Sequence, residues 1–582
     1  MKKHIFVRLL RFLRPYGLRF LFLLTLLLAG NLLSLAAPLL SGRAVDAVGI
    51  RAGGVDFSGV FWNCAGMLGC YALSSLVSYW VSSRLIRTAQ AVSHDLRGAA
   101  FDHMSELPVD YFDTHPAGDL ISRVCYDVDT VHATLSTDLL QLGTSVFTVA
   151  GSFLMLLLLS PRLTLVFLVT VPLSAALTRF QMKRIHPLFR LRSKELGALN
   201  AFAEERMGCR KSIRTYGVEE ADLGLFDQRN DAASKAYYDA DRASAALGPS
   251  VNFINNLSLA AVSVFGALLY LGGGLSLGSL SSFVLYSRKF SGPIREAANL
   301  LAELQASAAA AERVLDLLDQ EPEAADTAGA RPVEHVQGDI RFDHVTFGYD
   351  PARPVLRDFT AHIPAGSLAA VVGPTGAGKT TLVSLLLRFY RPQRGTITMD
   401  GVPLDAYSRD GLRRRLALVL QDTWLFGGTI AENIAYGAPG ASREQIVEAA
   451  KAARIHRFVS SLPQGYDTVL TCEGISKGQK QLLAIARCLL TDADVVILDE
   501  ATSNVDTETE GEISLAMERL RQGRTCFVIA HRLATIQNAD QILVVDDGRI
   551  VQRGTHRELA AQPGRYRSFV ETRQRAEGWN IA

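Results

Sequence analysis

Gly373-Pro374-Thr375-Gly376-Ala377-Gly378-Lys379-Thr380-Thr381 is the stretch that decides the fold of the C-terminal part of this chain. It fits the spacing G-x-x-x-x-G-K-[ST] and follows an apolar run at 368–372. Glycines here let the backbone wrap so closely that successive N–H groups face phosphate oxygens, and a helix predicted over 380–389 would offer its N-terminus to the same anion. The stretch therefore predicts a nucleoside triphosphate site formed by all nine residues. In it, Lys379 would reach the β- and γ-phosphates and the Thr380 hydroxyl would ligate Mg²⁺.

Short apolar runs with β character alternate with helical runs on both sides of this loop, as in an α/β nucleotide-binding domain. The predicted strands, besides 368–372, are 340–347, 416–420, 495–498, 526–530 and 542–545. The predicted helices are 380–389, 443–453, 478–490 and 508–520.

Two of these strands end in residues that suit phosphate chemistry. The run at 495–498 is followed by Asp499 and Glu500. In a phosphate-loop protein the first carboxylate is expected to hold Mg²⁺ and the second to polarise the attacking water. The run at 526–530 is followed by His531, whose ring N–H could contact the γ-phosphate. An isolated histidine would more simply be a core residue, but its position after this strand favours the catalytic interpretation.

Length and composition narrow the remaining possibilities. A chain of 582 residues is too long to fold around a single hydrophobic core. Domains of roughly 100–200 residues would give three or four units before membrane segments are considered. The formal charge of +2 is close to balance, so we expect no nucleic-acid partner. Seven cysteines show no C-x-x-C spacing, and neither a disulfide framework nor a zinc site is predicted.

Six apolar stretches in the first half are each long enough to cross a bilayer as a helix. They are 18–40, 61–86, 139–160, 163–180, 251–273 and 275–301. Lys and Arg concentrate in the N-terminus and in 84–137 and 181–248, which the positive-inside rule places in the cytoplasm. Residues 1–16 have the pattern of a basic amphipathic helix at a membrane surface. The apolar run that follows is too long for a signal peptide.

An acidic linker rich in Pro, Gly and Ala follows residue 317. We therefore expect a surface helix over 1–16, a membrane domain with six helices and two long cytoplasmic loops over 17–317, the linker over 318–337, and a nucleotide-binding domain over 338–582. The fold class is multi-domain: an all-α transmembrane domain followed by an α/β phosphate-loop domain.

Together these residues resemble the ATP-binding cassette transporter family, and specifically its bacterial half-transporters of exporter arrangement, over essentially the whole chain. The resemblance implies ATP and Mg²⁺ as cofactors. It implies that Tyr349 stacks on adenine, for which an ordinary core tyrosine is the alternative. It also implies that Gln421 senses Mg²⁺ and acts with Lys379, Glu500 and His531 in hydrolysis.

Other segments match family motifs that work between chains or between domains. Ser476, Gly478 and Gln479 resemble the signature that caps the ATP held on the other chain's phosphate loop, and 503–506 resembles the loop that crosses the dimer interface. Residues 111–127 and 216–220 look like the two coupling regions of the cytoplasmic loops, although ordinary solvated loops would look similar.

The resemblance implies an ATP hydrolase coupled to transport that works as a dimer in the lipid bilayer. We expect it in the bacterial inner membrane, with the N-terminus and the nucleotide-binding domain in the cytoplasm. It would export amphiphilic small molecules, drugs, lipids or peptides. Two alternatives stay open: an importer of a chelate or other small molecule on the exporter fold, and an ATP-gated regulatory partner without net pumping.

One departure from the family bears on the partner. Glu473-Gly474 runs straight into Ile475-Ser476, where family members usually have two more residues, and Lys477 occupies a position that is Gly in many members. An irregular signature beside a complete set of catalytic acids and histidine favours a heterodimer with a second half-transporter, and a homodimer remains open.

Two charges bear on the substrate. Arg288 and Lys289 lie about 13 residues, or roughly 20 Å of helix, into the last predicted span. The other five apolar stretches contain no Asp or Glu. We therefore expect water, the partner chain or a substrate anion to compensate these charges, and we predict a preference for amphiphiles with an acidic or strongly hydrogen-bonding group.

Overall fold

The computed structural model describes residues 12, 14–49, 55–327, 329–420, 423–470, 474–499, 507–530 and 533–578. The chain forms two compact units, each held together by contacts among its own residues. The helical unit comprises the residues up to Glu106 together with Pro116–Gln320, and the nucleotide unit comprises Leu107–His115 and Glu321–Ala582. The surface helix predicted over 1–16 lies mostly outside the described residues, which include a short turn at Arg14–Tyr16.

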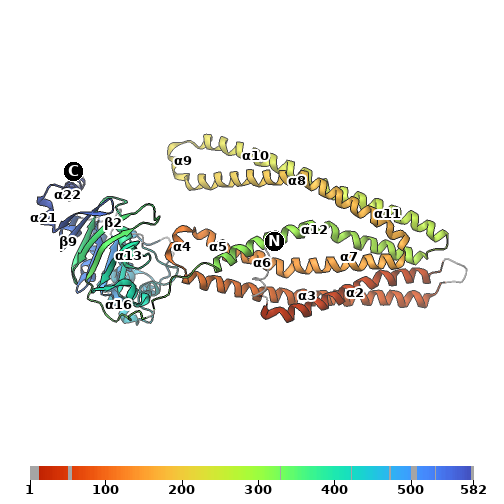
Figure 1. The fold of residues 1–582 in the computed structure, drawn as a ribbon, viewed down its shortest axis with the longest axis horizontal. Helices are drawn as coiled ribbons and strands as arrows, with labels where there is room; N and C mark the ends of the chain where they lie inside the picture. The colour runs from red at the N-terminus through yellow and green to blue at the C-terminus, as the bar shows by residue number, and fades with distance from the viewer. Residues whose placement is uncertain are drawn as a thin grey trace. The chain divides into compact units, whose positions relative to one another are not determined.

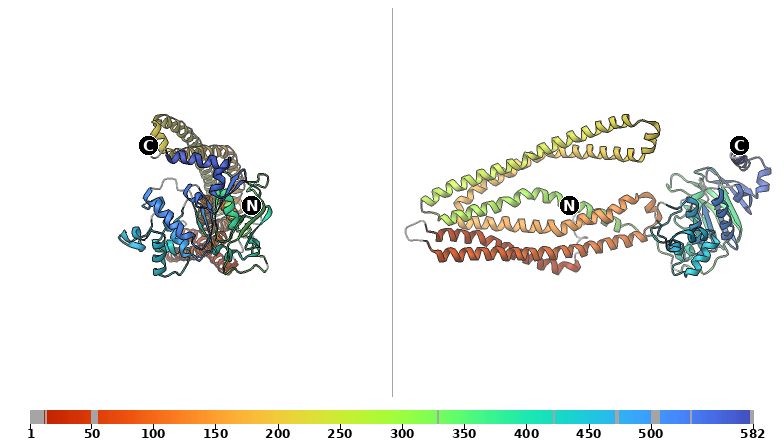
Figure 2. Two further views of the ribbon diagram at one scale, coloured as in Figure 1. Left: turned by 90° about the vertical axis from the view of Figure 1, so that its left-hand side faces the viewer. Right: turned by 180° about the vertical axis from the view of Figure 1, so that it is seen from behind.

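Long helices make up the helical unit (Figure 1). They are α2 (Gly17–Ala47), α3 (Phe57–Glu106), α7 (Leu139–Leu159), α8 (Pro161–Gly208), α10 (Glu219–Ala245), α11 (Leu247–Leu271) and α12 (Leu277–Leu318). Shorter pieces precede α7, namely α5 (Ala117–Ser122), η2 (Arg123–Asp127), α6 (Val128–Ala133) and η3 (Thr134–Asp138), where η2 and η3 are π-helical. In Figures 1 and 2, α8 and α10 diverge from the bundle of α2, α3, α7 and α12 toward α9 (Arg210–Tyr216). The predicted second coupling region, 216–220, forms the turn between α9 and α10.

Five helical stretches among the described residues are long and apolar enough to cross a membrane: Arg14–Ala47, Phe57–Glu106, Ala117–Leu159, Pro161–Gly208 and Glu219–Leu271. They cover the first five predicted spans to within two residues at each end. The sixth predicted span falls on α12, a helix of 42 residues that is not among the five and carries Arg288 and Lys289. The chain is thus a multi-pass membrane protein in which the sixth crossing stays a prediction.

Close packing of α2 against α12 closes one end of the bundle. The Gly278 N–H and the Ser276 hydroxyl each donate to the Asp46 carboxylate at 2.7 Å, and the Ser282 hydroxyl donates to the Pro38 carbonyl at 2.8 Å. A Cβ added at Gly278 would lie 1.9 Å from the Gly42 carbonyl oxygen. Only a residue without a side chain allows the two backbones to come this close.

We predict that Gly278→Ala destabilises the helical unit, because the added methyl group meets backbone that cannot move without breaking the Asp46 contacts. Overpacking of this kind costs about 1–3 kcal/mol. Gly69→Ala on α3 is the matched control, since a Cβ there has no neighbour within 4 Å. Thermal unfolding of the purified protein in detergent measures both, and an equal midpoint for the two variants would refute the predicted crowding.

Two sheets form the core of the nucleotide unit. The six-stranded sheet has the order β10 (Arg549–Gly554), β9 (Gln541–Asp546), β3 (Leu368–Val372), β8 (Thr525–Ile529), β7 (Val495–Asp499) and β6 (Leu416–Val419). All its pairs are parallel except β10 with β9. The antiparallel sheet has the order β2 (Leu356–Ile363), β1 (Ile340–Phe347), β4 (Arg394–Met399) and β5 (Val402–Pro403).

Helices cover these sheets. They are α13 (Lys379–Leu386), α14 (Arg409–Arg414), α15 (Ile430–Ala435), α16 (Arg443–Ala452), α17 (His456–Ser461), α18 (Lys477–Leu490), α19 (Thr507–Arg521), α20 (Leu533–Gln537), α21 (His556–Ala561) and α22 (Arg565–Gly578). The short helix α4 (Val109–Thr114), part of the predicted first coupling region, packs with this unit. The predicted strands and helices are confirmed with boundaries shifted by at most three residues, whereas β2, β4, β5 and β10 were not predicted.

Candidate ATP site

The phosphate loop leaves the six-stranded sheet at the carboxyl end of β3. This strand lies between β9 and β8, and all five of its residues are buried. β7, which ends at Asp499, also runs parallel to β8. The carboxyl ends of parallel strands meet at one edge of a sheet, where ligands of such folds bind. Asp499 therefore lies on the same edge as the loop.

Glycine is required at two points of this loop. Gly378 precedes α13 with φ of +94°, a left-handed conformation that costs other residues roughly 1–2 kcal/mol. A Cβ at Gly373 would lie 2.1 Å from the carbonyl oxygen of Val545 on β9. The loop is thus wrapped against the sheet, with Pro374, Thr375 and Gly376 exposed and Ala377 buried beneath them.

Lys379 folds back over the loop. Its Nζ donates to the carbonyl oxygens of Gly373 and Pro374, both at 2.8 Å, and the residue is only 8% exposed. Burial lowers the pKa of this ammonium group from its ordinary value, and the Asp499 carboxylate opposes that shift. A bound triphosphate would oppose it further, so phosphate binding and the charge on Lys379 favour each other.

The two threonines that follow Lys379 in α13 differ in exposure. Thr380 is exposed, as a hydroxyl that meets a ligand must be. Thr381 is buried, and its Oγ1 lies 3.3 Å from the Tyr349 hydroxyl. The Tyr349 ring is 54% exposed and meets Phe347 and Tyr390 edge-on, with ring centroids 5.3 and 5.1 Å apart. Tyr349 therefore lies next to the phosphate-loop helix with part of its surface open to a base.

The predicted signature forms a regular helix start despite its shortened approach. The Ser476 hydroxyl accepts from the Gln479 N–H at 3.2 Å, and the Gln479 side-chain oxygen accepts from the Ser476 N–H at 3.0 Å. This reciprocal pair caps the N-terminus of α18, where Gly478 is buried. Gly474 takes φ of +129°, and Ile475 packs against the core. The segment therefore presents the N-terminus of a 14-residue helix, which attracts anions.

Three predicted catalytic residues, Gln421, Glu500 and His531, lie outside the described residues, as does the predicted interface loop 503–506. Their neighbours are described. Leu420 follows β6, Asp499 ends β7 and Ala530 follows β8, and these strands are adjacent in the sheet. Their assigned roles stay predictions.

The described residues fit ATP with Mg²⁺. Exposed loop residues, Lys379 and the start of α13 suit the phosphates, and Thr380 and Asp499 are oxygen ligands of the kind that Mg²⁺ takes. No group of three or more His, Cys, Asp or Glu able to hold a metal occurs in the described part of the chain. Such a set is not needed, because Mg²⁺ binds through one or two protein groups, waters and substrate phosphates.

Sequence reasoning placed Thr381 in the nucleotide site but missed its contact with Tyr349, and it missed Tyr390 as the aromatic neighbour of Tyr349. Tyr390 comes four residues after the end of α13. Its nearness to the phosphate-loop helix was the available signal, although nothing in the local pattern shows which aromatic residues it meets.

Comparison with known proteins agrees with this geometry. The ABC transporter transmembrane region matches residues 20–294, and the ABC transporter family matches residues 356–503. A fatty acid ABC transporter ATP-binding/permease protein of Mycobacterium tuberculosis is 44% identical over 533 residues, which cover 91% of this chain and 83% of that protein. An ATP-dependent lipid A-core flippase of Chromohalobacter salexigens is 36% identical over 503 residues, 86% of each chain. Among solved structures, a bacterial Atm1-family ABC exporter with ATP bound aligns with a TM-score of 0.77 and 28% identity, over 96% of this chain and 98% of that one.

We predict that two substitutions at this site affect different steps, one ATP binding and the other ATP hydrolysis. Lys379→Ala should weaken ATP binding about 10- to 100-fold, the equivalent of losing one charge-assisted hydrogen bond. Glu500→Gln should keep ATP affinity but stop turnover, because an amide preserves shape and cannot polarise water as a carboxylate does. Fluorescent-nucleotide titration and phosphate release measure the two. Hydrolysis at the wild-type rate by Glu500→Gln, in a dimer with no other competent site, would show that the assignment is wrong.

Proposed function

Because this chain belongs to the ABC transporter family, we propose that it is one half of a pump for amphiphiles that carry an acyl chain and an acidic headgroup. Its fused transmembrane and ATP-binding domains make it a half-transporter of exporter type, with an ATPase coupled to transport. We place it in the bacterial inner membrane, with the nucleotide unit on the cytoplasmic side.

Two adjacent cations on α12 carry the substrate proposal. Arg288 is exposed. Lys289 is partly buried, and its Nζ donates to the Ser34 carbonyl at 2.6 Å and to the Ser34 hydroxyl at 2.8 Å, with the Tyr71 ring centroid 5.7 Å away. We expected water, the partner chain or a substrate to compensate Lys289, and Ser34 of the same chain does so in part. These acceptors are uncharged, and among the residues whose side chains the structure describes, which leave out 291–299, neither cation has a carboxylate partner.

An unpaired charge in a membrane-spanning segment costs roughly 2.5–3.5 kcal/mol on insertion scales. An acidic headgroup between Arg288 and Lys289 would recover part of that cost, while an acyl chain would lie along the apolar helices. Two relatives support this class, since their names specify fatty acid transport and lipid A-core flipping.

The ATP site supplies the energy in this proposal. Lys379 and the phosphate loop hold the phosphates, Tyr349 stacks on adenine, and Thr380, Gln421 and Asp499 would hold Mg²⁺, which neutralises phosphate charge. Glu500 and His531 act in hydrolysis. Two ATP molecules bind the closed dimer of nucleotide units better than the open one, so binding shifts the membrane domains and hydrolysis resets them.

Transport in the opposite direction, as an importer on the exporter fold, is the second candidate. Inside-out and right-side-out vesicles distinguish the two by the side on which labelled substrate accumulates. A regulatory partner without net pumping would accumulate substrate in neither orientation.

We predict that Arg288→Ala/Lys289→Ala lowers the oleate-stimulated ATPase activity of the reconstituted transporter about tenfold, the value of one charge-assisted hydrogen bond, and leaves unstimulated activity unchanged. The charge-preserving variant Arg288→Lys/Lys289→Arg is the matched control and should keep most of the stimulation. Methyl oleate, which lacks the negative charge, should not distinguish the variants. Equal oleate stimulation of the alanine variant and the wild type would exclude an anion site here.

We also propose that the natural partner is a different half-transporter. In heterodimers of this family one ATP site is often weakened, and the weakness divides between the chains. This chain combines the predicted catalytic set Asp499, Glu500 and His531 with a signature whose approach is shortened and which carries Lys477. In a homodimer that signature would face both ATP molecules. A partner with a regular signature would give Glu500 one good site.

Expression of this chain alone tests the pairing. We predict low ATP turnover by the single chain and full activity only after co-expression with a second half-transporter. A stable homodimer that hydrolyses ATP at both sites with full transport would refute the heterodimer. Because Ser476 forms a regular helix cap, low ATP turnover by the single chain would not come from misfolding of the signature helix.

A further inference from the structure

Lys289 belongs to a seam of polar contacts between α2 and α12. In this seam the Ser282 hydroxyl donates to the Pro38 carbonyl at 2.8 Å, and the Tyr286 hydroxyl donates to the Leu35 carbonyl. Both donors are buried. Side chains of α12 therefore meet backbone carbonyls of α2, which a regular α-helix uses as acceptors for its own N–H groups.

Pro38 explains why one of these carbonyls needs a donor from another helix. It lies inside α2, is buried and has no N–H. In a regular α-helix the N–H of residue 38 would donate to the carbonyl of Ser34. That carbonyl lacks its usual donor here, and the Lys289 Nζ donates to it at 2.6 Å. An unpaired carbonyl in a membrane-spanning segment is costly, so the lysine satisfies a group that the proline leaves open.

The Lys289 side chain is directed toward α2 and α3. Its Nζ also donates to the Ser34 hydroxyl at 2.8 Å and lies 5.7 Å from the ring centroid of Tyr71 on α3. Arg288 is exposed, and successive residues of a helix point about 100° apart. An anion that contacts both cations must therefore draw the Lys289 ammonium partly away from Ser34. The flexible four-carbon stem of lysine allows this movement.

We propose that Pro38 and Ser34 are positioning residues, which hold Lys289 in a resting position until an anionic headgroup binds it. This inference rests on the proposed function, in which Lys289 binds the acidic headgroup. In the resting position Lys289 ties α2 to α12. When a ligand carboxylate binds the ammonium group, the Ser34 carbonyl loses its donor and this contact of the seam opens. Ligand binding and loosening of the seam are therefore coupled, since the ammonium group favours the acceptor that binds it better.

The resting position also makes the site selective for charge. A ligand must replace the bonds from Lys289 to Ser34 before it gains any of its own. A carboxylate or phosphate can do so, because hydrogen bonds to an ionised acceptor are roughly twice as strong as those between neutral groups. A neutral hydroxyl or ester cannot. The affinity for the anion is lowered by the same exchange, because only the protein with Lys289 released is ready to bind it.

The test compares Ser34→Ala/Pro38→Ala with the wild type in the full-length transporter. The Pro38→Ala change supplies the missing N–H to the carbonyl of residue 34, and the Ser34→Ala change removes the hydroxyl acceptor. Pro172→Ala is the matched control. Pro172 also lies inside a long apolar helix, α8, but it is exposed, and no described side chain donates to the Leu168 carbonyl that it leaves without a helix donor.

Thermal unfolding in detergent tests the resting contact without any ligand. Lys289→Met keeps most of the stem and removes the donors, so it should lower the unfolding midpoint in the wild type and in Pro172→Ala. It should lower the midpoint much less in Ser34→Ala/Pro38→Ala, where the acceptors are already removed or occupied. The difference is the interaction that a double-mutant cycle isolates. Equal decreases in all three backgrounds would overturn the proposal.

Oleate-stimulated ATPase activity of the reconstituted transporter tests the exchange itself. In Ser34→Ala/Pro38→Ala, half-maximal stimulation should need about three- to tenfold less oleate, the value of roughly one hydrogen bond, while maximal stimulation changes little. Pro172→Ala should match the wild type. An unchanged oleate requirement, in a protein whose stimulation depends on Lys289, would contradict the proposal. So would an increased requirement, which would show that Ser34 holds Lys289 ready for the ligand.

Failure of the proposed function gives a different result. If Lys289→Met left the oleate stimulation of the wild type unchanged, the anion site would be wrong and the exchange with it. The unfolding cycle would then assign Lys289 to the carbonyl left open by Pro38 as a purely structural contact. If stimulation depends on Lys289 but not on Ser34 and Pro38, the anion site stands and only the resting position is refuted.

Discussion

Burial of β3 between β8 and β9 is the constraint on which the nucleotide unit depends. All five residues of this strand are buried, so its backbone is fixed by hydrogen bonds on both edges, by helices on one face and by α13 and the antiparallel sheet on the other. The first residue of the phosphate loop has little freedom to move, since Gly373 already lies against the Val545 carbonyl. The position of Lys379 and the start of α13 follow from this one strand. A loop that must bind phosphate with backbone N–H groups needs such a rigid origin.

The two sheets of the nucleotide unit differ in how well their strands could be predicted from the sequence, for physical reasons. Strands of the parallel sheet are buried on both faces and read as continuous apolar runs, so five of its six were predicted. The antiparallel sheet depends on alternation, and bulges interrupt it. The β1–β2 register shifts between Phe342 and Val345 and again between Val345 and Phe347, and His344 and Asp358 take positive φ. An extra residue reverses the inside–outside pattern, which explains why β2 was not predicted beside β1.

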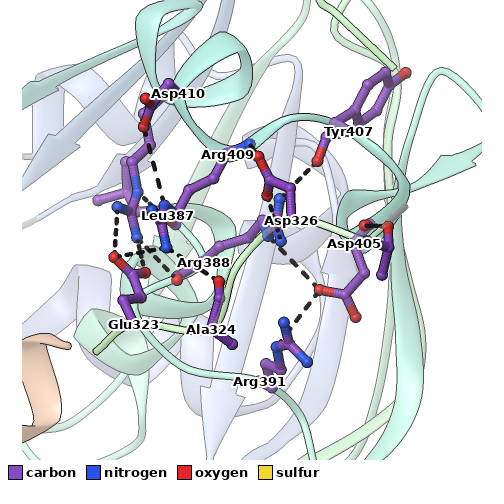
Figure 3. A network of polar contacts seen from close by, with 12 residues as sticks. Glu323, Ala324, Asp326, Leu387, Arg388, Arg391, Asp405, Tyr407, Arg409 and Asp410 are labelled. Atoms are coloured by element: carbon purple, nitrogen blue, oxygen red, sulfur yellow. Dashed lines mark hydrogen bonds and ion pairs between the residues drawn. The ribbon is translucent and has the colours of Figure 1, made fainter. Parts of the chain in front are cut away.

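In the candidate ATP site, too, some features could be predicted from the sequence and others could not. The phosphate-loop residues are contiguous, and their spacing alone predicts their chemistry. Contacts between distant residues have no such signature. Tyr390 and Asp113 are 277 positions apart, Arg413 and Glu323 are 90 apart, and Lys289 and Ser34 are 255 apart. Each residue alone suits an ordinary surface or core position. Only the fold brings them together, and that is why the linker appeared in the sequence as a spacer although Glu323 and Asp326 in it are bound by arginines (Figure 3).

The charged residues of α12 differ in how they are paired. Arg313, near its end, binds the buried Asp127 of η2 with two hydrogen bonds, one of them 2.8 Å long. Asp127 needs this cation as a partner, because burying its carboxylate alone would cost several kcal/mol. Arg288 and Lys289, about seven turns earlier on the same helix, have no carboxylate among the described residues. Lys289 has only the oxygens of Ser34. One helix therefore carries a cation paired with a carboxylate near its end and, about seven turns earlier, two adjacent cations of which one is bound only by uncharged oxygens. This difference in pairing, more than the presence of charge, is the observation that supports the proposed anion site at Arg288 and Lys289.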